Sequence, residues 1–141
     1  MDQFAEFFKN HTLLVMAFIG LTGGIVWTFI AGRTPGVARL GPADLTRLVN
    51  QEDAIVIDVR PDAEFRQGHI VGSINVPQKQ LESDLGRLQK YKNKPVVAVC
   101  KMGQDSAKAG AQLKKQGFEQ VHTLQGGLMA WQQAALPLAK E

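Results

Sequence analysis

The sequence predicts an α/β domain with a mostly parallel central sheet flanked by helices, preceded by one transmembrane helix. Two observations carry this prediction. From Asn10 to Gly32 the chain holds no Asp, Glu, Lys or Arg. After this stretch, short apolar runs typical of buried strands alternate with segments whose apolar residues recur at helical spacing. We therefore divide the 141 residues into a short N-terminal tail (1–10), a transmembrane helix (11–32), a linker (33–40) and a domain (41–141).

The uncharged stretch is long enough to cross a bilayer. Its 23 residues would form a helix of about 34 Å. A cleaved signal peptide is the alternative, but it would need a basic start and an Ala-x-Ala site. The chain starts instead with Asp2, Glu6 and Lys9, and no such site follows the apolar run. We therefore expect an uncleaved anchor in contact with membrane lipid.

Flanking charges and small residues refine this expectation. Arg33 and Arg39 follow the span, so the positive-inside rule places the C-terminal side in the cytoplasm. A single cysteine fits a reducing compartment. Gly20 and Gly24 have the spacing that lets two membrane helices approach closely, so a homodimer through these glycines is one alternative.

The first half of the domain follows from local signals. Gly32, Pro35 and Gly36 break any helix continuing from the span. The remaining expected elements are a helix opening at Pro42 with Leu45, Leu48 and Val49 on one face, a buried strand over 54–59, a short polar helix over 62–66, an extended segment over 70–76 stopped by Pro77, and a helix carrying Leu81, Leu85 and Leu88.

The second half centres on the chain's single cysteine. Four apolar residues, 96–99, form a buried strand that ends at Cys100, and a helix is expected over 106–116 with Asp105 or Ser106 as its cap. A strand over 120–124 and a last helix from Gly127 through Trp131 complete the domain. Ligand sites of parallel sheets lie at the carboxyl ends of strands, which is where Cys100 stands.

Cys100 is a candidate nucleophile because of the loop that follows it. Gly103 lets the short loop curl with its N–H groups pointing inward, and backbone donors near a helix N-terminus favour a thiolate. The alternative is a small buried core residue, which is a common role for cysteine.

Three motifs resemble those of rhodanese domains. The first rhodanese signature resembles two neighbouring stretches of this chain, Asp58-Val59-Arg60-x-x-x-Glu64-Phe65-x-x-Gly68-His69-Ile70 and Gly72-Ser73-Ile74-Asn75-Val76-Pro77. The second signature resembles Gly126-Gly127-Leu128-x-Ala130-Trp131. The cysteine loop lies between the two signatures. The resemblance covers about residues 40 to 138. One such domain behind one membrane helix is similar to small membrane-anchored rhodanese-like proteins of Gram-negative bacteria, which implies the inner membrane as location.

We expect most of the signature residues to be structural. Asp58 and Arg60 can pair at a strand end, Gly68 permits a turn that aims His69, and Trp131 belongs to the core. Gly126 and Gly127 allow a close turn into the last helix. His11 and His122 have no partners at metal-ligand spacing, so no metal site is expected.

The resemblance implies sulfurtransferase activity without a metal or organic cofactor. Cys100 would take a sulfane sulfur from a donor such as thiosulfate or a persulfide, and pass it to a thiol or protein acceptor. The loop residues would hold the anionic sulfur, and these are Lys101, Met102, Gly103, Gln104, Asp105 and Ser106. Asp105 opposes the charge of Lys101, which favours a protein-bound persulfide or small thiol over the thiosulfate dianion.

Other functions fit less well. Phosphatase-like cysteine loops use an Arg six positions after the cysteine, and position 106 is Ser. The net charge is only +3, and aromatic residues are not interleaved with the lysines, so no nucleic-acid partner is expected. A membrane-tethered adaptor with little catalysis remains the alternative to an enzyme.

Overall fold

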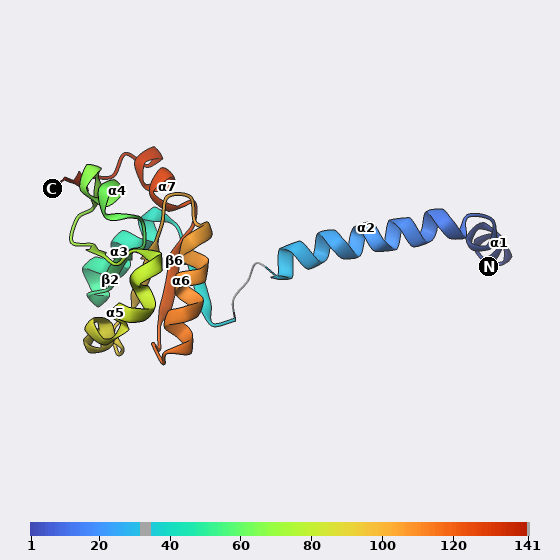
Figure 1. The fold of residues 1–141 in the computed structure, drawn as a ribbon. Helices are drawn as coiled ribbons and strands as arrows, with labels where there is room; N and C mark the ends of the chain where they lie inside the picture. The colour runs from blue at the N-terminus through green and yellow to red at the C-terminus, as the bar shows by residue number, and fades with distance from the viewer. Residues whose placement is uncertain (32–34, 141) are drawn as a thin grey trace. The chain divides into compact units, whose positions relative to one another are not determined.

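The computed structural model describes residues 1–31 and 35–140, and the chain divides into two compact units, Met1–Arg33 and Thr34–Glu141 (Figure 1). The first unit contains helix α1 (Asp2–Asn10) and helix α2 (Thr12–Ala31). The residues predicted as a tail are therefore helical. Gly32, the predicted end of the span, and Arg33, one of the two arginines on which the predicted orientation rests, lie outside the described residues.

Helix α2 is long and apolar enough to cross a membrane. It contains no Asp, Glu, Lys or Arg, and none of its residues is buried within the protein. Twenty residues at 1.5 Å each give about 30 Å, the thickness of a hydrocarbon core.

The second unit contains the predicted parallel sheet. Its strand order is β1-β6-β5-β2-β4, and every neighbouring pair is parallel. The strands are β1 (Val37–Leu40), β2 (Ile55–Asp58), β4 (Ile74–Asn75), β5 (Val96–Val99) and β6 (Val121–Leu124). A separate antiparallel pair joins β3 (His69–Ile70) to β7 (Leu138–Ala139).

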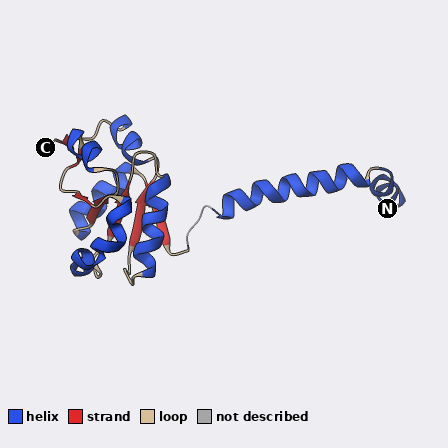
Figure 2. Cartoon of the chain, viewed as in Figure 1, coloured by secondary structure: helices blue, strands red, loops and turns tan. Residues whose placement is uncertain are grey.

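Helices pack on both faces of this sheet (Figure 2). The helices of this unit are α3 (Pro42–Glu52), α4 (Asp62–Gln67), α5 (Leu81–Leu88), α6 (Gln104–Lys115) and α7 (Gly127–Gln133), with short 3-10 turns η1 (Gln78–Gln80) and η2 (Gln89–Tyr91). The central strand β5 divides the core between the faces: Val96 and Ala98 pack with α5 and α6, whereas Val97 and Val99 pack with α3 and α7. The predicted α/β architecture is confirmed.

Two predicted boundaries need correction. Residues 37–40, expected within the linker, form edge strand β1, which pairs with β6 from Val37–Val121 to Leu40–Leu124. The segment 70–76, expected as one extended piece, contributes to two sheets through β3 and β4. A turn at Gly72 (φ +80°) separates these strands, because a left-handed residue cannot continue either one.

Candidate functional site

Cys100 lies directly after the central strand, at the carboxyl end of the sheet. Its side chain is 3% exposed and belongs to the core cluster on the α5 and α6 face. It is a free cysteine, the only cysteine of the sequence. Three residues separate it from α6, which begins at Gln104. Cys100 is therefore held in place by strand β5 before it and by the start of helix α6 after it.

A closed cycle of hydrogen bonds surrounds the sulfur. The Gly103 amide donates to Cys100 Sγ at 2.9 Å, and the thiol donates to Ser106 Oγ at 3.4 Å. The Ser106 hydroxyl in turn donates to the Gly103 carbonyl at 3.1 Å. If the thiol proton is lost, the hydrogen bond from the Gly103 amide to Sγ becomes charge-assisted. The Ser106 hydroxyl is then within reach to donate to Sγ instead of to the Gly103 carbonyl.

The helix cap differs from the prediction. Neither Asp105 nor Ser106 caps α6; the N-cap is Gly103, with φ +101° and no side-chain hydrogen bond. Ser106 is fully buried in the first turn, and its hydroxyl is used on the cysteine loop. Glycine suits this position because it adopts the left-handed conformation without steric cost, and its amide donates to Sγ from there.

The remaining loop residues are less engaged with the sulfur. Lys101, Met102, Gln104 and Asp105 are exposed. Their predicted role in substrate binding stays a prediction, whereas Gly103 and Ser106 contact the sulfur directly.

The start of α7, with Gly126 as its N-cap and Gly127 as its first residue, holds the backbone of the cysteine loop. The amide of Leu128 donates to the Cys100 carbonyl at 2.8 Å, and that of Met129 donates to the Lys101 carbonyl at 3.1 Å. Gly127 has φ +60°, and a Cβ there would overlap the Cys100 carbonyl oxygen and the carbonyl group of Lys101. Glycine is required at this position by both the backbone conformation and the close approach of the loop.

The first signature forms a clamp at the end of β2. Asp58 is fully buried, and its carboxylate accepts bonds from Arg60 Nε at 3.0 Å and Nη2 at 2.8 Å. Arg60 Nη2 also donates to the Gly68 carbonyl at 2.7 Å, which ties the strand end to the end of α4. Gly68 itself has φ 164°, an extended conformation that any residue adopts. The predicted Asp58–Arg60 pair is therefore present, and most of the arginine's charge is used within the fold.

His69 and Trp131 make contacts within the fold. His69 Nδ1 is bonded to the Phe65 carbonyl at 2.8 Å, and its ring stacks on Phe65 at a centroid distance of 3.8 Å. Trp131 is buried and donates through Nε1 to the Pro137 carbonyl at 3.0 Å. In the described part of the chain, no group of three His, Cys, Asp or Glu side chains could hold a metal ion.

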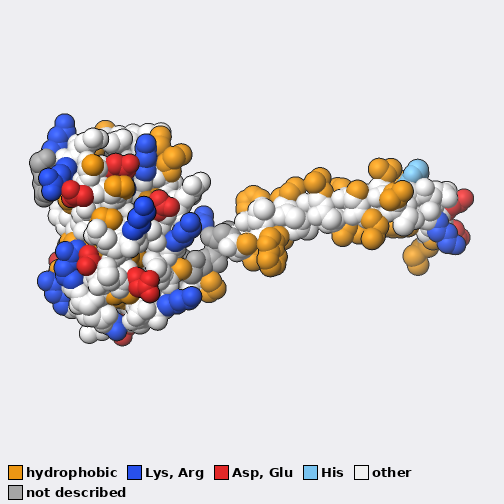
Figure 3. Space-filling model, viewed as in Figure 1, with side chains coloured by type: hydrophobic (Ala, Val, Ile, Leu, Met, Phe, Trp, Pro, Cys, Tyr) orange, Lys and Arg blue, Asp and Glu red, His pale blue; other side chains and the backbone are white. Residues whose placement is uncertain are grey.

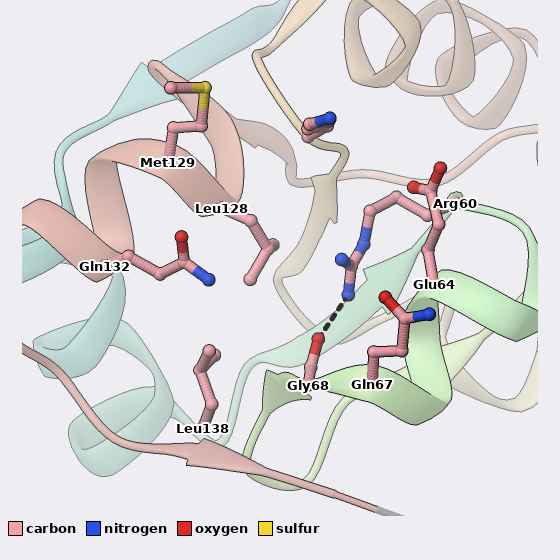
Figure 4. A pocket seen from close by; sticks show the side chains of 9 residues that line it. Arg60, Glu64, Gln67, Gly68, Leu128, Met129, Gln132 and Leu138 are labelled. Atoms are coloured by element: carbon pink, nitrogen blue, oxygen red, sulfur yellow. Dashed lines mark hydrogen bonds between the residues drawn. The ribbon is translucent and has the colours of Figure 1, made fainter.

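A cavity of about 340 Å³ lies beside the loop and was not foreseen from the sequence. Figure 4 shows Glu64 and Gln67 of α4 on one side, Leu128 and Gln132 of α7 on the other, and the Arg60–Gly68 bond at its wall. Lys101 is the loop residue that lines it; the other lining residues are Met129 and Leu138. Of its polar lining residues on α4 and α7, Glu64 belongs to the first signature, and Gln67 and Gln132 each adjoin a signature residue. This proximity is the signal that the sequence offered.

Comparison with known proteins gives consistent results. Residues 41–134 match the family described as Rhodanese-like domain. The chain is 36% identical to the uncharacterized protein YibN of Escherichia coli over 141 residues, 99% of each chain. It is 34% identical to a sulfurtransferase of Allochromatium vinosum over 92 residues, 65% of this chain and 84% of that protein. A rhodanese-related protein from Thermoplasma volcanium has a similar structure, with a TM-score of 0.66, 29% identity, and coverage of 74% of this chain and 99% of that one.

Proposed function

Since the chain belongs to the rhodanese-like domain family, we propose that it is a membrane-anchored sulfurtransferase that carries sulfane sulfur as a persulfide on Cys100. The observation that carries the proposal is the 2.9 Å bond from the Gly103 amide to a sulfur already held at the end of a central strand. Relatives named as sulfurtransferases support the reaction class.

The reaction needs two displacements at sulfur. The Cys100 thiolate attacks the outer sulfur of a persulfide donor, the donor's S–S bond breaks, and the donor leaves as a thiolate. An acceptor thiolate then attacks the outer sulfur of the Cys100 persulfide, and the electron pair of the broken S–S bond returns to Cys100. Each step forms one S–S bond and breaks one, so no external oxidant, reductant or metal enters the balance.

The cycle of hydrogen bonds supplies what each step needs. Negative charge rests on Cys100 Sγ before the first attack and after the second, and the Gly103 amide, which donates to that atom in the structure, is placed to stabilise it. Ser106 offers a second donor once the thiol proton has gone. A fixed donor requires no rearrangement as the charge returns.

We infer that the cavity beside Lys101 receives the donor or acceptor molecule. Its volume of about 340 Å³ is that of about eleven water molecules in the liquid, much larger than thiosulfate needs. Glu64 would offset the charge of Lys101 toward a dianion, and the Arg60 guanidinium is already paired with Asp58. These features favour a thiol or persulfide with an extended, partly apolar body over thiosulfate.

The proposed location follows from the anchor. Helix α2 would hold the protein in the bacterial inner membrane, with the rhodanese-like domain in the cytoplasm, where a free thiol stays reduced. The adaptor alternative predicts a protein that does not load sulfur, so the same experiment separates the two functions.

The test is Cys100→Ser in the full chain in detergent micelles. Serine is nearly isosteric but far less nucleophilic, so sulfur transfer from a persulfide donor should be abolished while the unfolding midpoint changes little. Mass spectrometry of the gently isolated protein should show the mass of one added sulfur on Cys100 and none on the variant. Undiminished transfer by the variant would exclude Cys100 as the carrier, and an unmodified, inactive parent protein would favour the adaptor.

A further inference from the structure

The first helix of the chain has an apolar face that is open to its surroundings. Helix α1 contains no buried residue. Phe4, Phe7 and Phe8 are 74%, 56% and 53% exposed. Steps of three and four residues place these rings on one side of the helix. Three adjacent exposed phenylalanines on nine residues are far more apolar surface than a short helix in water normally carries.

The opposite side of α1 is charged. Asp2, Glu6 and Lys9 alternate with the rings along the helix and fall on the other face. In Figure 3 the acidic and basic side chains of this unit gather at its N-terminal end, whereas the remainder of the helical stretch is covered by hydrophobic and uncharged atoms. Asp2 stands in the first turn and Lys9 in the last, which suits the helix dipole. Such an amphipathic helix is suited to an interface and not to the interior of a bilayer.

The junction between α1 and α2 is a single residue. His11 has φ −126° and ψ 33°, so the helix breaks there and α1 turns away from the axis of α2 (Figure 1). The broken turn is satisfied internally: the His11 amide donates to the Phe7 carbonyl at 3.0 Å. Thr12 Oγ1 donates to the carbonyls of Phe8 at 2.8 Å and Lys9 at 3.1 Å. A bend that leaves few carbonyls unpaired is tolerable at the edge of a membrane.

We propose that α1 lies in the membrane–water interface, with Phe4, Phe7 and Phe8 between the lipid acyl chains and the charged face toward water. The inference rests on the proposed anchoring of the chain by α2. Lipid is the occupant of this face because α1 joins the span through one residue, so the face begins where the hydrocarbon ends. With a single lysine, binding depends on apolar burial and does not require anionic lipid. The helix would set how deep α2 enters the bilayer.

The experiment uses nitroxide labels on the full chain in vesicles of phosphatidylcholine and phosphatidylglycerol. In a Cys100→Ser background, single cysteines are introduced by Phe7→Cys, by Glu6→Cys as the matched control on the opposite face, and by Ile19→Cys within α2. Each label's accessibility to oxygen, which concentrates in lipid, is compared with that to a water-soluble nickel chelate. We expect oxygen to dominate at residues 7 and 19 and nickel to dominate at residue 6.

Each other result would overturn the proposal in a distinguishable way. Nickel dominance at both 6 and 7 would place α1 in water, and oxygen dominance at both would make it part of the span. A label at 7 shielded from both reagents would indicate a protein contact, such as a second copy. Nickel dominance at residue 19 would remove the anchor together with this inference, whereas oxygen dominance at 19 alone would remove only the interfacial helix. The sulfur-transfer test of Cys100 is independent of all these outcomes.

Discussion

Helices α6 and α7 begin in the same way but use their first turns differently. Each follows a glycine in the left-handed conformation, Gly103 at φ +101° and Gly126 at φ +75°, and neither has a side-chain cap. The first-turn amides of α7 donate to the carbonyls of Cys100 and Lys101. At the start of α6, the cap amide donates to the sulfur of Cys100. One helix start therefore holds the backbone of the loop, and the other holds the sulfur of Cys100.

This difference teaches how a short loop becomes a rigid sulfur site. Donors in a helix's first turn have no partner within the helix, so they are available to whatever lies next to them. In α7 they are used on neutral carbonyls, which stabilises the fold. In α6 the donor faces a group that can carry negative charge, which stabilises one state of that group over another.

The largest effect is expected from Gly127→Ala, which tests the contact between the start of α7 and the cysteine loop. The new Cβ would overlap the Cys100 carbonyl, and alanine would be strained at φ +60°. We expect a loss of about 3 kcal/mol or more in the free energy of unfolding, together with loss of sulfur transfer. Urea unfolding of the full chain in micelles measures the change in the free energy of unfolding. The control is Gly86→Ala in α5, where no atom lies within 4 Å and a gain of about 0.5–1 kcal/mol is expected; equal losses at both sites would contradict the support role of α7.

A smaller effect, aimed at the α6 side, is expected from Gly103→Ala. Alanine at φ +101° costs about 1–2 kcal/mol and displaces the amide from Cys100 Sγ. The matched control is Gly72→Ala, at φ +80° with open space around it. Both variants should lose similar stability, but only Gly103→Ala should lose sulfur-transfer rate. If the two variants retained equal activity, the amide would have no part in the reaction.

The smallest effect concerns β6, the strand that leads into α7. His122 pairs in register with Val97, and neither ring nitrogen has a hydrogen-bond partner among the described residues. Burial lowers the pKa of His122 below 6.5, partly opposed by the charge of Glu52. The imidazole of His122 therefore binds a proton more readily in the unfolded chain than in the folded one. His122 has no effect on the free energy of unfolding well above pH 6.5, and it lowers that free energy as the pH falls below this value.

The test for this strand is His122→Leu. The free energy of unfolding should decline less between about pH 7.5 and about pH 5.5 in the variant than in the parent protein. The other histidines are common to both proteins, so the difference isolates position 122. Identical slopes would show that His122 is equally protonated in the folded and unfolded chains.

Local sequence signals predicted the central elements and missed those set by distant contacts. The strand into Cys100 and the Asp58–Arg60 pair follow from apolar runs and short spacing. Strand β1 is not recognisable from the sequence, because two of its four residues are exposed and two are half-buried at the sheet edge, and the strand follows a glycine. The Gly103 cap was missed because Asp105 and Ser106 are better caps by residue type, while tertiary contacts use Ser106 elsewhere.

The two helix starts also bear on how a partner would recognise the protein if, as proposed, Cys100 carries a second sulfur. The carbonyls of Cys100 and Lys101 are held by α7, and the Gly103 amide is held by the sulfur. Few backbone groups of the loop are therefore free to rearrange when one atom is added at Sγ. The empty and loaded forms would share one shape, so a partner would distinguish them by the terminal sulfur alone, and delivery would be decided by chemical reactivity instead of a conformational signal.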